Sequence, residues 1–468
     1  MKKNNKNIIL FIIILISSII ITGLMIFLNN NDSYWFLNFL PLLFVLVLMV
    51  CYNTFSNIFT SFSVLLLIGC YYMRIVILPL VYVIFDYSSL VTNEVFSSYI
   101  VHASLLTIYE FFIVMFFCNI VIRKQNKKKD MQLSRLEKKE IVHVKNKKMT
   151  YIVFILVLFV VISYILYPTF ISYFHFIFET NYEAQNAYSI NYVAMQQSIP
   201  KLLYWLVVYA FGILQIILPI LLISYINKTK LTQNFKFLIS IIVVLAVLLI
   251  ATPDVAKSII ISLTLGIVLL KLYPKKKRII SFVLIVGFIP VVFLGIFIKS
   301  GVHEIGNSIS SVSQAYFSGI PNIATSFLLQ GRPNPLMIFT DIVKATPFVL
   351  SFFKDVQSTP NLFNYILFNN TDGHHSQIIP MIGQSMYYFG ILLSPIISVL
   401  SATIALYFEK KYSQISYICE KYLYLLIAIY FAIAPVVYNF SIMISIFLQL
   451  FLPCLLIIKL PKTLKEYD

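Results

Sequence analysis

The chain has 468 residues, of which 60% are hydrophobic and 11% are charged. Soluble globular proteins carry roughly twice that share of charged residues, so the composition excludes an ordinary soluble enzyme or binding module. It predicts a protein whose body lies in a membrane, and the formal net charge of +17 then becomes information about topology.

Apolar runs that are long enough, or nearly long enough, to cross about 30 Å of hydrocarbon follow one another along the chain. In lipid each backbone polar group has to be satisfied within its own segment, so these runs are expected to be α-helices. We predict one all-α polytopic membrane domain over residues 1–468. Its transmembrane helices, about twelve in number, are expected near 8–28, 34–51, 62–85, 98–122, 150–167, 202–226, 237–252, 258–272, 279–298, 379–406, 422–438 and 441–459.

Lys and Arg residues gather in alternate connections between these runs. Lys2, Lys3 and Lys6 precede the first run, and the connection 123–149 holds eleven of the 35 basic residues. Because basic connections stay on the cytoplasmic side, we expect both termini and the loop 123–149 to be cytoplasmic. These patches flank membrane spans and accompany no nucleic-acid-binding motif. We therefore expect membrane lipid, and no nucleic acid, as their partner.

Two connections on the opposite, outer side are polar, namely 168–200 and 300–378. The second is the longest interruption of the apolar pattern. Helices that only need joining take short turns, so we expect chemistry in the large loop 300–378. No cysteine lies in an outer connection, and no P-loop or dinucleotide-binding glycine pattern is present. We expect no metal and no cofactor, and an ATP-driven pump is unsupported.

The pair His374-His375 in the large loop follows Asp372 and precedes an apolar run. Histidine titrates near neutral pH, so either ring is a candidate general base that Asp372 would orient. The alternative is that the pair caps and orients the incoming helix. A metal site is the weaker interpretation because adjacent side chains rarely converge and no further ligand set accompanies them.

Arg332 lies in a Gly-Arg-Pro-Asn-Pro turn of the same loop. A guanidinium offers a bidentate fork for phosphate, so Arg332 is a candidate ligand of a diphosphate, although an exposed loop cation could serve solubility alone. Lys257, in a short outer turn, and Lys344 are secondary candidates. Tyr316 is a candidate for stacking on sugar, although tyrosine is also the usual residue of membrane interfaces.

Two ionisable residues, Arg74 and Glu110, lie inside predicted spans. Charges at such depth are costly and usually serve a purpose. One interpretation pairs them with each other or with backbone across neighbouring helices. The other places Arg74 in a pocket as a second ligand of phosphate.

Two short motifs frame the large loop: Ala315-Tyr316-Phe317-Ser318-Gly319-Ile320-Pro321-Asn322, and Ile379-Pro380-Met381-Ile382-Gly383-Gln384-Ser385-Met386-Tyr387-Tyr388-Phe389-Gly390. With these motifs and its hydropathy the chain resembles the Wzy-type repeat-unit polymerases of O-antigen and capsular polysaccharide synthesis. The resemblance implies a fold like that of the GT-C membrane glycosyltransferases. It also implies a place in the bacterial cytoplasmic membrane, where undecaprenyl-diphosphate-linked oligosaccharides are joined on the outer face without metal or nucleotide sugar.

In such a reaction the donor and the acceptor are both lipid-linked, and a flippase and a chain-length regulator are expected partners. Arg332 would bind the diphosphate, His374 or His375 would act as base, and Asp372 would orient that histidine. Two alternatives stay open: a flippase of lipid-linked oligosaccharides, and an enzyme similar to the O-antigen ligases. Flippases work from a charged central cavity and have short external loops, which favours the polymerase. An ion-coupled transporter is more distant still, because it would show broken helices with polar residues in matching halves.

Overall fold

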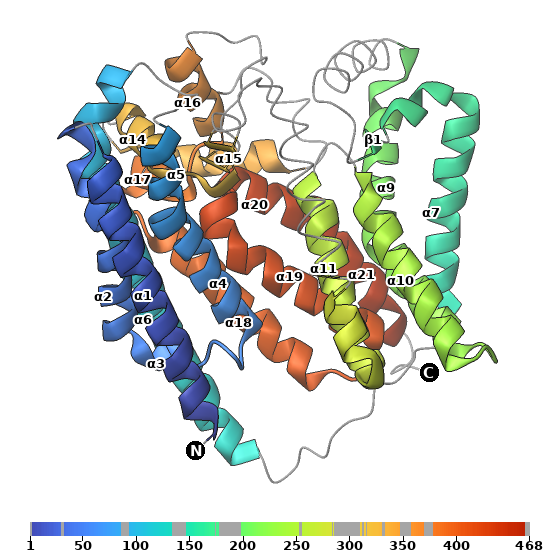
Figure 1. Cartoon of the computed structure of the whole chain (residues 1–468). Helices are drawn as coiled ribbons and strands as arrows, with labels where there is room; N and C mark the ends of the chain where they lie inside the picture. Colours follow the sequence, from blue (N-terminus) through green and yellow to red (C-terminus); the bar gives the residue numbers. More distant parts are fainter. Residues whose placement is uncertain are drawn as a thin grey trace. The chain divides into compact units, whose positions relative to one another are not determined.

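The structure is a computed structural model, and it describes residues 2–29, 32–85, 93–132, 147–173, 175–176, 198–251, 255–282, 284, 309–310, 313–314, 316–329, 333–346, 357–368 and 378–463. Where the sequence predicts one integral domain, the chain divides into two compact units (Figure 1). The first comprises Met1–Glu137, Glu304–Lys410 and Ala428–Ile446, and the second comprises Lys138–His303, Lys411–Ile427 and Phe447–Asp468.

Seven helices in the described part of the chain are long and apolar enough to cross a membrane, or eight if one bent pair of helices is a single span. The seven are Asn5–Leu28, Phe62–Phe85, Ser98–Gln125, Met149–Leu166, Lys201–Lys228, Ile418–Val437 and Phe440–Lys459. The prediction of a polytopic helical membrane protein is confirmed at this level. Twelve spans and a GT-C fold stay predictions.

The predicted span 379–406 is wrong as a single helix. The structure has a helix α17 (Met381–Phe389), a turn, and a second helix α18 (Ile396–Gln414). The first helix ends at Gly390, whose φ of 77° is open to glycine and strained for other residues. The apolar pattern runs on across this turn, so hydropathy alone could not detect it.

The first unit holds most of the elements that concern function. In chain order they are α1 (Lys2–Leu28), η1 (Asp32–Phe39), α2 (Leu40–Val50), α3 (Tyr52–Phe55), α4 (Phe62–Tyr72), the π-helical turn η2 (Met73–Ile77), α5 (Leu78–Phe85), α6 (Asn93–Gln132), α14 (Ile320–Ser326), η5 (Phe327–Leu329), α15 (Met337–Ala345), α16 (Thr359–Phe368), α17, α18 and α20 (Phe440–Ile446). The helix α19 (Ile418–Val437) belongs to the first unit from Ala428 onward.

The second unit is built from α7 (Lys147–Leu166), η3 (Pro168–Tyr173), β1 (His175–Phe176), α9 (Lys201–Lys228), α10 (Gln233–Leu249), β2 (Ile250–Ala251), α11 (Val255–Leu272), η4 (Pro274–Lys276), the π-helical turn η7 (Phe447–Phe451) and α21 (Leu452–Thr463). The two short strands pair antiparallel, with His175 opposite Ala251. Helix α9 packs against both α7 and α10, and α10 packs against α11.

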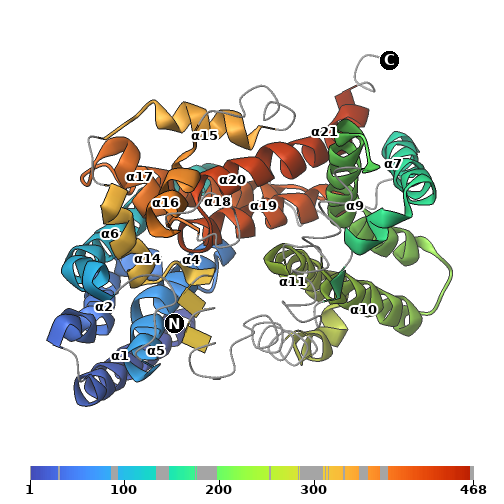
Figure 2. The same ribbon diagram turned by 90° about the horizontal axis from the view of Figure 1, so that it is seen from above.

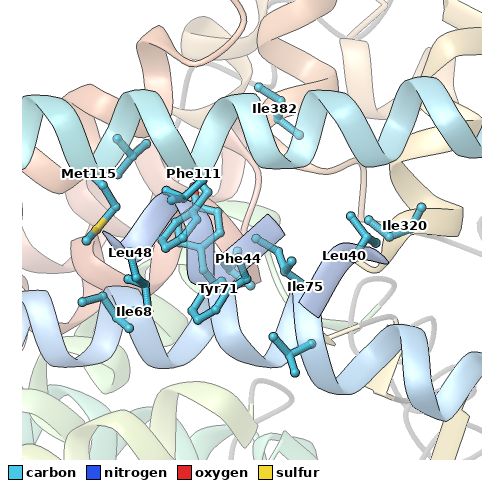
Figure 3. Close-up of a cluster of buried hydrophobic side chains, with 14 of the residues drawn as sticks. Leu40, Phe44, Leu48, Ile68, Tyr71, Ile75, Phe111, Met115, Ile320 and Ile382 are labelled. Atoms are coloured by element: carbon cyan, nitrogen blue, oxygen red, sulfur yellow. The ribbon is translucent and has the colours of Figure 1, made fainter. Parts of the chain in front are cut away.

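One apolar core joins the helices of the first unit. Phe44 of α2 stacks on Phe111 of α6 with ring centroids 4.8 Å apart. The ring centroid of Tyr71 of α4 also lies 4.8 Å from that of Phe111, and all three side chains belong to one cluster (Figure 3). Ile320 of α14 and Ile382 of α17 belong to the same core. The segments that bracket the large loop are therefore packed into the body of this unit.

The outer surface of α1 fits a hydrocarbon environment. Ile9, Ile13 and Ile20 are each 56% exposed, and isolated apolar side chains at a surface are common, but a continuous stripe along one helix is not. Such a stripe is stable where lipid tails cover it.

A group of basic residues of the first unit lies near one of its ends. There Asn7 of α1 donates to the carbonyl of Ser56 at 2.8 Å, and Gln125 near the end of α6 donates to the carbonyl of Leu406 at 3.4 Å. Lys6, Arg123, Lys124 and Lys410 lie in the same helix termini. At the opposite end of α6, Tyr99 stacks on Phe327 of η5 at 5.5 Å. The helices α14 to α17 thus lie away from the basic end (Figure 1).

Candidate functional site

Four of the predicted site residues, Arg332, Asp372, His374 and His375, lie outside the described residues, so their roles stay predictions. The elements on both sides of them are described. Helix α16 ends one residue before the segment 369–377, and α17 begins shortly after it. The candidate site is therefore built from the helices that frame these positions.

The centre of that frame is Asp341 on α15, whose side chain is fully buried. Its Oδ1 accepts the backbone N–H of Thr359, the first residue of α16, at 3.0 Å. Its Oδ2 accepts the side-chain amide of Gln384 at 2.9 Å and the hydroxyl of Tyr388, both on α17. One carboxylate thus joins α15 and α16, which lie within the large loop, to α17, which follows it.

The same network reaches the turn between α19 and α20. The Oε1 of Gln384 accepts the backbone N–H of Phe440 at 2.9 Å, and its Nε2 lies 2.9 Å from the hydroxyl of Ser441. Asn439 caps the start of α20 by accepting the N–H of Ile442 at 2.7 Å. Figure 2 shows α15, α16, α17 and α20 gathered together, seen from above.

Among the residues that the structure describes, no Lys, Arg or His forms an ion pair with this carboxylate. Burying a charge is costly unless hydrogen bonds or a partner compensate it. Here three donors do so. Burial, and after it the negative charge of Asp341, raises the pKa of Tyr388 above its usual range. Tyr388 therefore remains a neutral hydrogen-bond donor to Asp341 at physiological pH.

The local sequence explains why α15 turns Asp341 inward. Asp341 and Ala345 are buried and are four residues apart, so they share one face of the helix. Phe339 on another face is 64% exposed, and Leu336 just before the helix is 71% exposed. This polarity is inverted relative to a soluble amphipathic helix, and it suits a helix whose outer face meets lipid.

Sequence reasoning missed Asp341, Gln384 and Tyr388 as a group. Gln384 and Tyr388 are four residues apart within the second motif of the resemblance, a spacing that places both on one helical face. That spacing is the pattern in the sequence from which their shared face could have been predicted. Nothing local connects them to Asp341, which lies 43 residues before Gln384.

Arg74 pairs with Glu110 and with backbone carbonyls, as the first of its two interpretations predicts. Its Nη1 lies 3.0 Å from Glu110 Oε2, and both side chains are fully buried. Its Nε donates to the carbonyl of Phe317 at 3.1 Å, and its Nη2 donates to the carbonyls of Pro435 and Val436 at 3.1 and 2.8 Å. Ser398 of α18 donates to the other oxygen of Glu110. The guanidinium cross-links η2, α6 and the end of α19.

The described part of the first motif of the resemblance, from Tyr316 onward, forms a turn beside this ion pair. Ser318 is fully buried with a φ of 44°, and the N–H of Gly319 donates to the carbonyl of Gln314 at 3.1 Å before α14 begins. Tyr316 is half-buried in the same segment, next to Phe317. Tyr316 directly precedes Phe317, whose carbonyl accepts the hydrogen bond from Arg74 Nε.

The two predicted lysines lie in different units. Lys344 is half-buried on α15, three residues after Asp341. Lys257 lies near the start of α11 in the second unit, and its Nζ is 3.3 Å from the place that a Cβ on Gly212 would take. Next to it, Ser258 accepts a hydrogen bond from Gln215 at 3.0 Å. Binding of substrate by Lys257 and Lys344 stays a prediction.

A pocket of about 420 Å³ opens beside α17. Its walls are the end of η5, Pro333, the last residues of α17 from Met386 onward and the turn that follows Gly390. The N–H of Asn334 donates to the carbonyl of Tyr387 at 3.0 Å, which fixes the strand of chain after Pro333 against α17. Helix α17 therefore presents one face to Asp341 and another to an apolar pocket.

Within the described residues, no group of three His, Cys, Asp or Glu side chains is arranged to hold a metal ion. The donors that the site offers are a carboxylate, an amide, a phenol and hydroxyls. Compared with models of protein families, with curated proteins and with solved structures, the chain matches none.

Proposed function

We propose that this protein polymerises undecaprenyl-diphosphate-linked oligosaccharide repeat units into a surface polysaccharide of the capsule, O-antigen or exopolysaccharide type. The reaction is assigned to the outer face of a bacterial cytoplasmic membrane, with both termini in the cytoplasm. The proposal rests first on the resemblance of the two framing motifs to the Wzy-type polymerases.

The structural observation that supports it best is the buried Asp341 network. Asp341 lies in the polar interruption of the chain, in helices at the end of the first unit away from Lys6, Arg123 and Lys124. If basic ends face the cytoplasm, this network belongs to the outer side. Burying a set of polar groups at that end costs free energy, and such costly groups usually belong to a functional site.

The chemistry that we assign transfers the growing chain from its lipid diphosphate to the incoming unit. The bond between the anomeric carbon and the phosphate oxygen breaks, and the acceptor hydroxyl forms the new bond to that carbon. The diphosphate leaves with the bonding electron pair, and the base takes the hydroxyl proton. Arg332 is proposed to stabilise the charge on the diphosphate, and His374 or His375, oriented by Asp372, to act as base.

Asp341 is proposed as a positioning residue in this scheme. It holds Thr359 at the start of α16 and both Gln384 and Tyr388 on α17. The candidate residues of 369–377 lie in sequence between those two helices. Fixing both helices to one carboxylate supports a reproducible geometry for whatever the intervening segment carries.

The Arg74–Glu110 pair favours the polymerase over the flippase. A flippase needs charged groups that line a cavity for a polar headgroup. Arg74 and Glu110, the two ionisable residues predicted in mid-span, are fully buried and bonded to each other, to Ser398 and to backbone carbonyls. An enzyme similar to the O-antigen ligases differs from a polymerase in its acceptor, and the experiment below separates the two.

The test is the polysaccharide profile of a strain that lacks the gene, complemented with the wild-type protein or with Arg332→Ala. We expect the deletion strain to display single repeat units at its surface without long polymer, and wild type to restore the ladder. Arg332→Ala at normal protein level should fail to restore it. Repeat units trapped on the cytoplasmic side would indicate a flippase, and long polymer that stays on its lipid carrier would indicate a ligase.

A further inference from the structure

Two lysines of the second unit lie over the ring of one buried tyrosine of the same unit. Tyr412, close to the end of α18, is 4% exposed. The Nζ of Lys271, in the last turn of α11, is 4.2 Å from the centroid of this ring, and the Nζ of Lys421, in the first turn of α19, is 5.4 Å from it. The two ammonium groups therefore lie within about 10 Å of each other, which is close to the screening length of dilute salt, so their repulsion is only partly screened.

A third lysine joins this group from α21. The Nζ of Lys459 is 5.7 Å from the ring centroid of Tyr424. Tyr424 follows Lys421 by one helical turn on α19, a spacing that places both side chains on one face of the helix. We call Lys271, Lys421 and Lys459, which come from three different helices, the lysine cluster.

The lysine cluster lies where membrane-spanning segments end. The candidate span Phe440–Lys459 ends at Lys459, and the candidate span Ile418–Val437 begins three residues before Lys421. Lys271 is the residue before the last of α11. Because about 30 Å of hydrocarbon separates the two headgroup layers of a bilayer, the ends of spans lie at the level of the headgroups. The cluster is therefore at the depth of lipid phosphate groups.

Acidic residues balance only part of the charge of the cluster. Glu420, in the first turn of α19, is the one Asp or Glu in the part of the second unit that the structure describes, and it is 6% exposed. It supplies one negative charge against three positive ones. An ammonium group carries three N–H donors, so a lysine stacked on a ring can also donate to phosphate oxygens. The ring restricts a long, flexible side chain, which lowers the entropy lost when the ammonium group binds an anion.

We propose that the lysine cluster binds the phosphate group of an anionic glycerophospholipid, with Tyr412 and Tyr424 holding the lysines in place. Basic pockets between membrane helices are suited to such headgroups. The site lies in the second unit and takes no part in the reaction proposed above, so the inference does not rest on that function. A lipid bound there would join α11, α19 and α21 and would stabilise the second unit by mass action.

The first experiment leaves the sequence unchanged. The purified full-length protein in a neutral detergent is treated with an amine-acylating reagent, and the modification of each lysine is followed by mass spectrometry. We expect added phosphatidylglycerol to slow the modification of Lys271 and Lys459 by about fivefold, the factor expected for one contact between a lysine and an anionic headgroup. Lys230 is exposed, as those two lysines are, and lies outside the cluster; its modification should change less than twofold.

Two further arms identify the source of the phosphate. Phosphatidylcholine and inorganic phosphate, each at the same concentration, should leave the modification of the cluster unchanged. Equal protection by phosphatidylcholine would overturn the assignment and mean ordinary coverage by lipid. Equal protection by inorganic phosphate would overturn the lipid as ligand and mean a site for a soluble anion. No protection by any of the three would overturn the site itself.

Variants test the same site by affinity. In titrations followed by thermal unfolding, the double variant Lys271→Gln/Lys421→Gln should bind phosphatidylglycerol at least tenfold more weakly than wild type. The matched control Lys230→Gln removes a charge from the same unit and should keep the wild-type affinity. The double variant Lys271→Arg/Lys421→Arg keeps the charges and should bind within threefold of wild type. Unchanged affinity in the folded glutamine variant would contradict the proposal, and if that variant does not fold, protection of the wild-type lysines decides.

Discussion

Replacing Arg74 by Met would remove the charge and all four hydrogen bonds that join η2, α6, the turn before α14 and the end of α19. Methionine keeps most of the apolar stem, so the change isolates the guanidinium. Glu110 would then be left fully buried, with Ser398 as a remaining hydrogen-bond donor. Because Arg74 links these elements, Arg74→Met is expected to lower the stability of the fold.

The magnitude follows from the burial of both partners. Breaking a buried ion pair by removing one side costs about 3–5 kcal/mol, because the other charge stays uncompensated. The carbonyls of Phe317, Pro435 and Val436 also lose a charged donor, and hydrogen bonds to charged groups are worth about 1.5–3 kcal/mol each. Even the lower figure is a large fraction of a typical total stability of about 5–15 kcal/mol.

The assay is thermal unfolding of the detergent-solubilised protein, followed by the loss of its monodisperse size-exclusion peak. We expect Arg74→Met and Glu110→Leu each to lower the midpoint strongly. The double variant should lose less than the sum, with a coupling of about 0.5–3 kcal/mol. An unchanged midpoint for Arg74→Met together with loss of polymer would refute this reasoning, because it would mean that the guanidinium serves the substrate rather than the fold.

Three further outcomes are expected. Gly383→Ala should destabilise the protein by about 1–3 kcal/mol, because the new Cβ would lie 2.5 Å from the Cβ of Ser326. The matched control Gly69→Ala meets nothing within 4 Å and should be neutral or stabilising. Equal thermal midpoints for the two variants would contradict the packing of α17 on α14. The pKa of Tyr388 is raised on folding, so its contribution to stability is complete below about pH 10 and is lost as the pH rises above it. In Tyr388→Phe the thermal midpoint should therefore fall less steeply at alkaline pH than in wild type. The same alkaline fall in both proteins would exclude this contribution. Glu409→Ala should cost about 0.5–2 kcal/mol, since this carboxylate accepts three hydrogen bonds at the start of α4; unfolding in denaturant checks it.

Much of the fold could be predicted because lipid leaves the backbone few choices. The runs 8–28 and 150–167 are uniformly apolar and match the candidate spans Asn5–Leu28 and Met149–Leu166 to within three residues at each end. The run 379–406 is equally apolar, yet Gly390 divides it, because a positive φ depends on one residue and not on average hydropathy. Hydropathy therefore finds apolar segments and misses where they turn.

The candidate site was less accessible to sequence reasoning. Arg74 and Glu110 stood out because each is a lone charge in an apolar run, and their pairing was one of the alternatives considered. Asp341 did not stand out, because a carboxylate in a polar loop is usually solvated. Its burial depends on Gln384 and Tyr388, which are distant in sequence. Such tertiary pairing leaves no local pattern that distinguishes it from an exposed loop residue.

The most direct test of the proposed activity uses the purified protein in liposomes with lipid-linked repeat units extracted from the deletion strain. No nucleotide sugar, ATP or added metal is supplied. We expect a ladder of products that grow by whole repeat units, with free undecaprenyl diphosphate released at each step. Repeat units that cross the bilayer without being joined, or that remain unchanged while the protein is folded, would contradict it.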